Sequence, residues 1–330
     1  MSKILCFGEL LLRFSPEMDG KSIDGAAVPV FIGGAELNVA SALANWSLPS
    51  RYCTALPKNY FVEKLIEEIK HRGIDTSAII HSGERFGIYY LPQGTDIKNH
   101  AVIYDRAHSS FSELEPGMLD WEAIMNEVSW FHFSAINPAL NEKVAAVCEE
   151  AINTATSKGI TISIDLNYRA KLWQYGKDPT SIMPGLVNKC QVVMGNLWAV
   201  EKLLGISSTV SDSTGKKHHE LIEAADRSME TFLDRFQHTK TLAYTFRLDD
   251  EYFAVLNLRG ERSVSKTFSL VGVTDRIGSG DCFMAALIYG LYQEHPPTDI
   301  INFAAAAAVT KLHERGDATR QSIEQIKSMI

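Results

Sequence analysis

The sequence has few cysteines and no closely spaced pair of them. Its five cysteines, at positions 6, 53, 148, 190 and 282, are scattered through 330 residues. No C-x-x-C pair is present for zinc binding or disulfide exchange, which excludes the common forms of both kinds of site. Because widely spaced cysteines are typical of a reducing compartment, we expect a cytoplasmic protein.

Long apolar stretches and basic runs are also missing. No segment reaches the roughly 18 apolar residues of a membrane-spanning helix. The short apolar run after Lys3 is interrupted by Glu9, which is unlike a signal peptide. The 40 acidic residues exceed the 32 basic ones, for a formal net charge of −8. We therefore expect neither a membrane nor a nucleic acid as a partner.

Apolar runs and helix-like segments alternate along most of the chain. Strands are predicted near residues 3–7, 129–133, 160–166 and 192–195, and helices near 35–46, 141–157, 179–188, 198–204 and 221–236. Further strands are predicted near 242–245, 252–258 and 263–270, and helices that begin near 281, 297 and 319. This alternation predicts an α/β fold with parallel strands, helices on both faces, and antiparallel strands at one edge.

A second group of strands has no helices between its members. Residues 26–32, 86–91 and 100–104 are β-branched or aromatic, and turn-rich links such as 92–96 join them. We expect a small antiparallel sheet, formed by about 11–32 and 81–107, projecting from one domain that spans 1–330. Residues 10–14 could instead continue the first strand past Gly8. Because an exposed sheet edge often gains a partner, a homo-oligomer formed through this sheet is also expected.

The strongest local signal is the segment DRIGSGD at residues 275–281, which precedes an apolar helix. Gly278, Ser279 and Gly280 allow backbone N–H groups to converge at the helix start, where the dipole is positive, so an anion should bind there. Asp281 is expected at the N-cap, placed to accept a proton from a hydroxyl that attacks a bound phosphate. The alternative is that Asp281 only caps the helix. Cys282 follows in the first turn and could be a reactive thiol or a small buried residue.

Two other phosphate-binding patterns are absent. The sequence has no G-x-x-x-x-G-K-[ST], and Phe283 stands where a dinucleotide fingerprint needs glycine or alanine. A Walker-type NTPase and a Rossmann dehydrogenase are therefore disfavoured.

Two segments together resemble the signatures of the ribokinase-type (PfkB family) carbohydrate kinases. GGAELNVA at 33–40 and DRIGSGD at 275–281 occur in the family's order and separation, and the likeness covers essentially the whole chain. Within the family, the sequence is most similar to the 2-keto-3-deoxygluconate kinases, through GELLLRFSP at 8–16, IYDR at 103–106, FHFS at 131–134 and DLNYR at 165–169. The resemblance implies a ribokinase-like three-layer sandwich with a mostly parallel central sheet and a small projecting β lid over the sugar.

The resemblance also implies roles for individual residues. Asp281 would activate the acceptor hydroxyl, and Gly278, Ser279 and Gly280 would form the anion hole, with ATP and Mg²⁺ as cofactors. The implied substrate-binding residues are Gly33, Gly34, Asn38, Tyr89, Tyr104, Arg106, Asn167 and Arg169. The implied nucleotide-binding residues are Asn196, Thr245 and Gly280. Asn38 could instead be an ordinary polar residue of a helix's first turn, and Arg106 a solvated arginine of the lid.

These residues predict ATP-dependent phosphorylation of the terminal hydroxyl of 2-dehydro-3-deoxy-D-gluconate, with arginines that bind its carboxylate. A kinase for a neutral ketose, such as fructose or tagatose, would use the same machinery. A catalytically silent sugar-binding relative is the third alternative.

Three departures from the family pattern bear on this choice. The usual Asn-x-x-Glu lacks its carboxylate, because Ala199 stands three residues after Asn196, so the residues that would hold magnesium are left open. Arg276 and Ile277 replace a commoner pair of small residues. Arg247 stands where a nucleotide-side Thr-x-Gly has its glycine.

Overall fold

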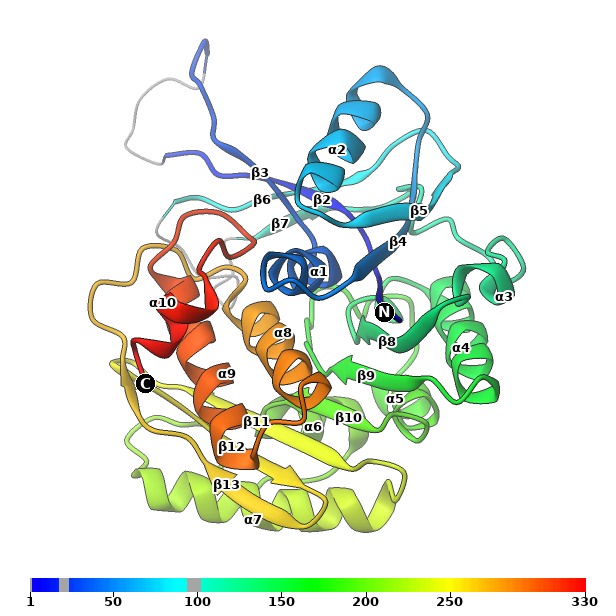
Figure 1. Ribbon diagram of the computed structural model, residues 1–330. Helices are drawn as coiled ribbons and strands as arrows, with labels where there is room; N and C mark the ends of the chain where they lie inside the picture. Colours follow the sequence, from blue (N-terminus) through cyan, green and yellow to red (C-terminus); the bar gives the residue numbers. More distant parts are fainter. Residues whose placement is uncertain (1, 18–23, 94–101) are drawn as a thin grey trace.

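The computed structural model describes residues 2–17, 24–93 and 102–330. Within these residues a ten-stranded sheet forms the body of the molecule (Figure 1). Its strands are, in spatial order, β13 (Glu261–Val264), β12 (Glu251–Leu258), β11 (Thr241–Arg247), β10 (Val192–Gly195), β9 (Thr161–Asp165), β8 (Val128–Ser134), β1 (Lys3–Phe7), β4 (Ser50–Leu56) and β5 (Asp75–His81), with β14 (Phe268–Ser269) beside β12. Neighbours from β11 to β5 are parallel, whereas β12 is antiparallel to its neighbours. The predicted mostly parallel sheet with an antiparallel edge is confirmed.

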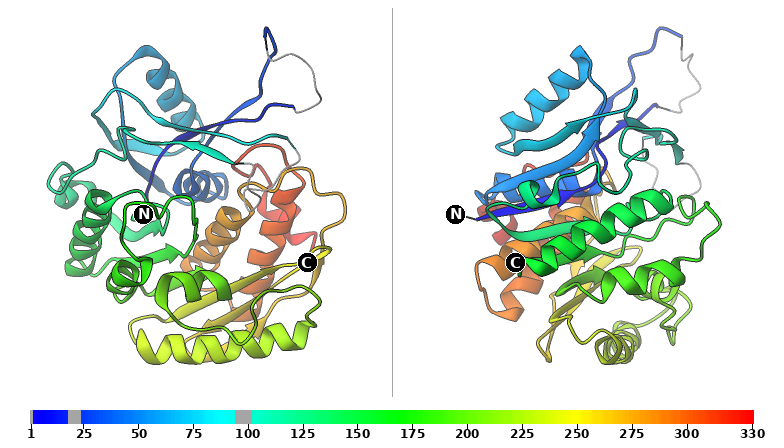
Figure 2. Two further views of the ribbon diagram at one scale, coloured as in Figure 1. Left: turned by 180° about the vertical axis from the view of Figure 1, so that it is seen from behind. Right: turned by 90° about the vertical axis from the view of Figure 1, so that its right-hand side faces the viewer.

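Helices cover both faces of this sheet, which gives three layers (Figure 2). One face carries α3 (Trp121–Ile124), α4 (Glu142–Ser157), α5 (Pro179–Val187), α6 (Leu197–Leu204) and α7 (His218–Arg235). The other carries α1 (Ala35–Asn45), α2 (Tyr60–His71), α8 (Ser279–Tyr292), α9 (Pro297–Leu312) and α10 (Ile323–Lys327). Because side chains alternate along a strand, successive residues of β1 lie in the two different hydrophobic cores. Leu5 and Phe7 lie in the core under α3 to α7, and Ile4 and Cys6 in the core under the other group of helices.

A separate four-stranded sheet lies above this body. Its strands are, in spatial order, β3 (Val30–Gly33), β2 (Leu11–Phe14), β6 (Gly87–Tyr90) and β7 (Ile103–Asp105). The expectation of a wholly antiparallel sheet is wrong, because β2 runs parallel to β6. The alternative in which residues 10–14 continue β1 is also wrong: β1 ends at Phe7 and β2 becomes a central strand of the small sheet. Residues 18–23 and 94–101 of the predicted lid lie outside the described part of the chain.

Alternate residues of the small sheet face opposite directions. Arg13, Tyr89 and Tyr104 occupy one row of cross-strand neighbours, and the last two line the cavity described below. Among the helices that the structure describes, none has the length and apolar character needed to cross a membrane.

Candidate active site

A cavity of about 420 Å³ opens at the carboxyl ends of the parallel strands. This is where ligands of open α/β sheets bind, because the loops that follow successive strands meet there. Its walls come from the ends of β9, β10 and β11, the starts of α1 and α8, and the inner face of the small sheet. The cavity is lined by these predicted site residues: Gly34, Asn38, Tyr89, Tyr104, Arg106, Asn167, Arg169, Asn196, Thr245, Gly278, Ser279, Gly280 and Asp281.

The predicted anion cradle lies at the start of the 14-residue helix α8. Gly278 is its N-cap and has a left-handed backbone with φ 77°. A Cβ at this position would lie 1.9 Å from the carbonyl oxygen of Asp317, so both conformation and space require glycine. The first N–H groups of a helix lack intrahelical partners and carry the positive end of its dipole. The geometry at the start of α8 is therefore compatible with the predicted anion cradle.

Asp281 is the third residue of α8, so the expectation that it occupies the N-cap is wrong. Its Oδ2 accepts a hydrogen bond of 2.7 Å from Nδ2 of Asn38, a residue expected to hold sugar hydroxyls. Burial raises the pKa of Asp281 to about 6, and the hydrogen bond from Asn38 opposes that rise. Asn38 therefore orients the candidate base and favours its ionised form.

Other buried carboxyl groups interact with Asp281, among them Asp165 and Glu36, which sequence analysis did not assign to the site. Burial, followed by the negative charge of Asp281, raises the pKa of Asp165 to about 8. Burial raises the pKa of Glu36 to about 7, and a hydrogen bond with Ser134 opposes the rise. Of these carboxyl groups, Asp281 is the one in the first turn of α8, beside the predicted cradle. Its position therefore makes it the candidate base.

Arg169 follows β9 and is half-buried at the cavity wall. Its Nη1 donates a 3.0 Å hydrogen bond to the carbonyl of the preceding residue, Tyr168. Its positive charge lowers the pKa of both Asp165 and Asp281, which places the guanidinium within electrostatic reach of the candidate base.

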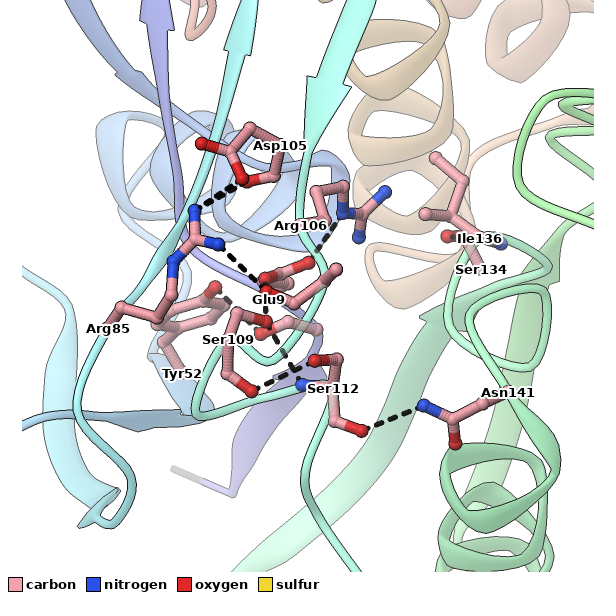
Figure 3. Close-up of polar contacts among 12 residues, drawn as sticks. Glu9, Tyr52, Arg85, Asp105, Arg106, Ser109, Ser112, Ser134, Ile136 and Asn141 are labelled. Atoms are coloured by element: carbon pink, nitrogen blue, oxygen red, sulfur yellow. Dashed lines mark hydrogen bonds and ion pairs between the residues drawn. The ribbon is translucent and has the colours of Figure 1, made fainter.

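Arg106 directly follows β7 and is bound by Glu9 (Figure 3). Nε of Arg106 lies 2.6 Å from Oε2 of Glu9, and the Ser109 hydroxyl donates to Oε1 at 2.5 Å. All three residues are buried, so the alternative of a solvated lid arginine is wrong. Figure 3 shows the terminal nitrogens of Arg106 turned away from Glu9, and Arg106 lines the cavity. Glu9 thus fixes one edge of the guanidinium.

A second buried arginine connects the small sheet to the cradle. Nη2 of Arg13, on β2, lies 2.6 Å from Oδ2 of Asp275, and its Nε lies 2.8 Å from Oδ1 of Asp317. The Tyr89 hydroxyl donates to Oδ2 of Asp317 at 2.8 Å. A Cβ on Gly33 would lie 2.2 Å from the same Asp317 oxygen, so this glycine packs against Asp317 and does not line the cavity. Sequence analysis missed Arg13 and Asp317, although Arg13 lies within the segment 8–16 that was compared with the family.

The nucleotide-side candidates make hydrogen bonds within the protein. Oδ1 of Asn196 accepts from the backbone N–H of Ala199 and caps α6. The Thr245 hydroxyl donates to the Gly195 carbonyl at 3.4 Å. In the described residues, no group of three or more His, Cys, Asp or Glu side chains is arranged to hold a metal ion.

Cys282 is not the reactive thiol that its position in a helix's first turn suggested. The side chain is buried, and burial raises the thiol pKa well above its ordinary value. The alternative of a small buried residue is the one observed. All five cysteines are buried and unpaired, and the cytoplasmic location expected from their spacing stays a prediction.

Comparison with known proteins supports the family resemblance. The model of the pfkB family carbohydrate kinases matches residues 1–324. The structure of 2-dehydro-3-deoxygluconokinase from Thermotoga maritima superposes with a TM-score of 0.89, at 34% identity over 99% of both chains. The 2-dehydro-3-deoxygalactonokinase of Haloferax volcanii is 26% identical over 100% of this chain and 96% of its own. The 5-dehydro-2-deoxygluconokinase of Geobacillus kaustophilus is 25% identical over 89% of this chain and 84% of its own.

These matches confirm the ribokinase-like three-layer fold and the family resemblance drawn from the two signatures. The chain belongs to the pfkB family of carbohydrate kinases.

Proposed function

We propose that this chain transfers the γ-phosphoryl group of ATP to the terminal hydroxyl of 2-dehydro-3-deoxy-D-gluconate, with Mg²⁺ as the metal. The main support is that Arg106 and Arg169 line the same cavity as Asp281 and the anion cradle. Two guanidinium groups beside a phosphoryl-transfer site suit an acceptor that carries a carboxylate. The similar proteins named above are kinases of dehydro-deoxy sugar acids by name, which agrees with this choice.

In the proposed reaction, the acceptor oxygen attacks the γ-phosphorus and the bond to the bridging oxygen of ADP breaks. The hydroxyl proton passes to Asp281, which Asn38 holds in a fixed orientation. Backbone N–H groups of Gly278, Ser279 and Gly280 would donate to the phosphoryl oxygens, where negative charge accumulates. Bound Mg²⁺ would neutralise charge on the phosphates.

Magnesium would take most of its ligands from phosphate oxygens and water. Mg²⁺ commonly keeps several waters and needs few protein ligands, so the lack of a metal-binding cluster in the described residues is compatible with its use. The missing carboxylate at Ala199 therefore does not favour a catalytically silent protein.

The test is a comparison of kcat/KM across sugars with an ATP-coupled assay. The panel contains 2-dehydro-3-deoxygluconate, 2-dehydro-3-deoxygalactonate, 5-dehydro-2-deoxygluconate, fructose and tagatose. We expect 2-dehydro-3-deoxygluconate to exceed the neutral ketoses by about tenfold to a few hundredfold, the range of one or two charge-assisted contacts. A higher value for fructose or tagatose would instead establish a neutral ketose kinase. Absence of turnover with every sugar would favour a silent relative.

We also propose that two copies of the chain associate through the outer face of the small sheet. Val30, Phe14, Tyr90 and Ile103 are consecutive cross-strand neighbours and form one apolar row on that face. Ile103 is 63% exposed, Val30 45% and Tyr90 39%. An apolar row on a sheet with free edges is suited to pairing with a second copy.

Charge placed in this row should separate the two copies. We expect the double variant Tyr90→Lys and Ile103→Lys to sediment as a monomer under conditions in which the unmodified chain is a dimer. Met118→Lys is the matched control, because Met118 is 42% exposed and lies outside the small sheet. An unmodified chain that remains monomeric at micromolar concentration in sedimentation velocity would refute the proposal.

A further inference from the structure

Lys311 is a fully buried lysine in the last turn of α9. An ammonium group removed from water is costly unless charged or polar neighbours compensate. Its Nζ donates a 3.2 Å hydrogen bond to the Glu314 carbonyl oxygen, which compensates only part of that cost. The remaining compensation must come from charges close to the ammonium group.

The lysine lies directly behind the anion cradle. A Cβ built on Gly278 would approach Cε of Lys311 to 3.3 Å, so the end of the lysine side chain packs against this turn. The same helix end is bound to the signature segment, because the backbone N–H groups of Thr274 and Asp275 donate to the Leu312 carbonyl at 2.8 and 3.1 Å. Lys311 and the cradle therefore form one packed unit.

Charges of both signs lie around Lys311. The carboxylates of Asp275, Glu314 and Asp317 attract its ammonium group, and Arg13 binds Asp275 and Asp317 by ion pairs. Without Lys311, Arg13 alone would offset this negative charge, and more of it would remain uncompensated behind a cradle that must bind an anion.

The positive charge also reaches the reacting groups. Lys311 contributes to lowering the pKa of Asp281 and of Cys282, which follow the cradle in α8. Its field is therefore felt where phosphoryl oxygens would meet the first N–H groups of the helix.

We propose that Lys311 is a positioning residue for phosphoryl transfer, whose buried ammonium lies behind the cradle and offsets the negative charge of Asp275, Glu314 and Asp317. The inference rests on the proposed phosphoryl transfer but is independent of which sugar is the acceptor. It assigns to a side chain of α9 a contribution to anion binding that backbone N–H groups alone would not supply.

The test separates the charge of Lys311 from its hydrogen bond. Lys311→Gln keeps a donor for the Glu314 carbonyl and removes the charge. We expect kcat, measured with the best sugar substrate, to fall about tenfold to a hundredfold, below the loss typical of a direct oxyanion contact. We expect affinity for a non-hydrolysable ATP analogue to fall about tenfold, whereas affinity for uncharged adenosine stays within twofold. Thr310→Val, a buried change in the same helix turn, is the control for packing.

Lys311→Ala provides a second measurement, because it leaves room for a small cation. Methylammonium ions should restore part of its kcat and of its affinity for the ATP analogue, without effect on the unmodified protein. Unchanged kcat and analogue affinity in folded Lys311→Gln would overturn the proposal. Equal losses of affinity for the analogue and for adenosine would also overturn it, as would a failure of methylammonium to restore either quantity. Unfolding of both variants would assign Lys311 a structural role instead. Analogue binding needs no sugar, so it reports on Lys311 even if the sugar panel fails.

Discussion

Asp281→Asn is expected to lower kcat by roughly 10²- to 10⁴-fold, the usual loss for a general base, while nucleotide affinity changes little. The amide cannot accept the proton of the acceptor hydroxyl. It is nearly the same size as the carboxylate and can still accept a hydrogen bond from Asn38, so the fold should persist. Steady-state kinetics and binding of an ATP analogue measure the two quantities separately.

A matched control distinguishes catalysis from an effect on the helix. Asp299 is the third residue of α9, as Asp281 is of α8, and both are acidic residues of a first turn. Asp299→Asn removes the same type of helix-dipole interaction far from the chemistry. Near-normal turnover in Asp281→Asn, or an equal loss in Asp299→Asn, would refute the role of Asp281 as a base.

The pH profile gives an independent readout of the same group. Burial raises the pKa of Asp281 to about 6, and a base acts only when deprotonated. We therefore expect kcat/KM to increase with pH up to about 6 and to level off above it. The residual activity of Asp281→Asn should not show this increase below pH 6. If the increase persists in the variant, it belongs to Asp165 or Glu36.

Arg169→Ala is expected to abolish most of the preference for a sugar acid. Each charge-assisted hydrogen bond typically contributes about 1.5 to 3 kcal/mol, which corresponds to about tenfold to a few hundredfold in kcat/KM. Values for 2-dehydro-3-deoxygluconate should fall by this amount, whereas those for fructose and tagatose should change less. Arg169→Lys keeps the positive charge but loses the planar guanidinium group, so its preference for the sugar acid over the neutral sugars should be intermediate.

Arg169 is the more informative of the two arginines. Truncation of Arg106 would leave Glu9 buried without its cationic partner, at a typical cost of about 3 to 5 kcal/mol, so a loss of activity could reflect instability. Arg169 is half-buried, and its Nη1 donates to the neighbouring backbone carbonyl of Tyr168, so its removal disturbs the protein less. An unchanged ratio between acid and neutral sugars in Arg169→Ala would show that it does not bind the carboxylate.

The sequence predicted the elements whose burial follows a simple pattern. β1 and β10 were predicted with the bounds observed, and α4 agrees to within a residue, because apolar runs and helical spacing mark their buried faces. α2 was missed although Asn59 caps it and Val62, Leu65 and Ile69 mark its buried side. That signal was available in the sequence.

Strand β4 was missed for a different reason. Its seven residues are all buried, yet they include Ser50, Arg51 and Thr54. Arg51 is tolerated there because it binds Asp75 and the carbonyls of Ile124 and Asn126, which lie on other elements. No local pattern identifies such a strand, since the compensation depends on long-range partners.

By itself, the sequence determined the anion cradle and its neighbouring carboxylate, because both are local features. Gly278 can adopt the left-handed backbone at the start of α8, and Asp281 lies three residues later whatever the rest of the chain does. Only the tertiary structure decided which charges surround them. Arg106 meets Glu9 across 97 residues of sequence, and Arg13 meets Asp317 across 304. Sheet topology brings these groups together, and burial then requires each charge to have a partner. For that reason Lys311, which in sequence is an ordinary lysine at a helix end, becomes a buried cation behind the cradle.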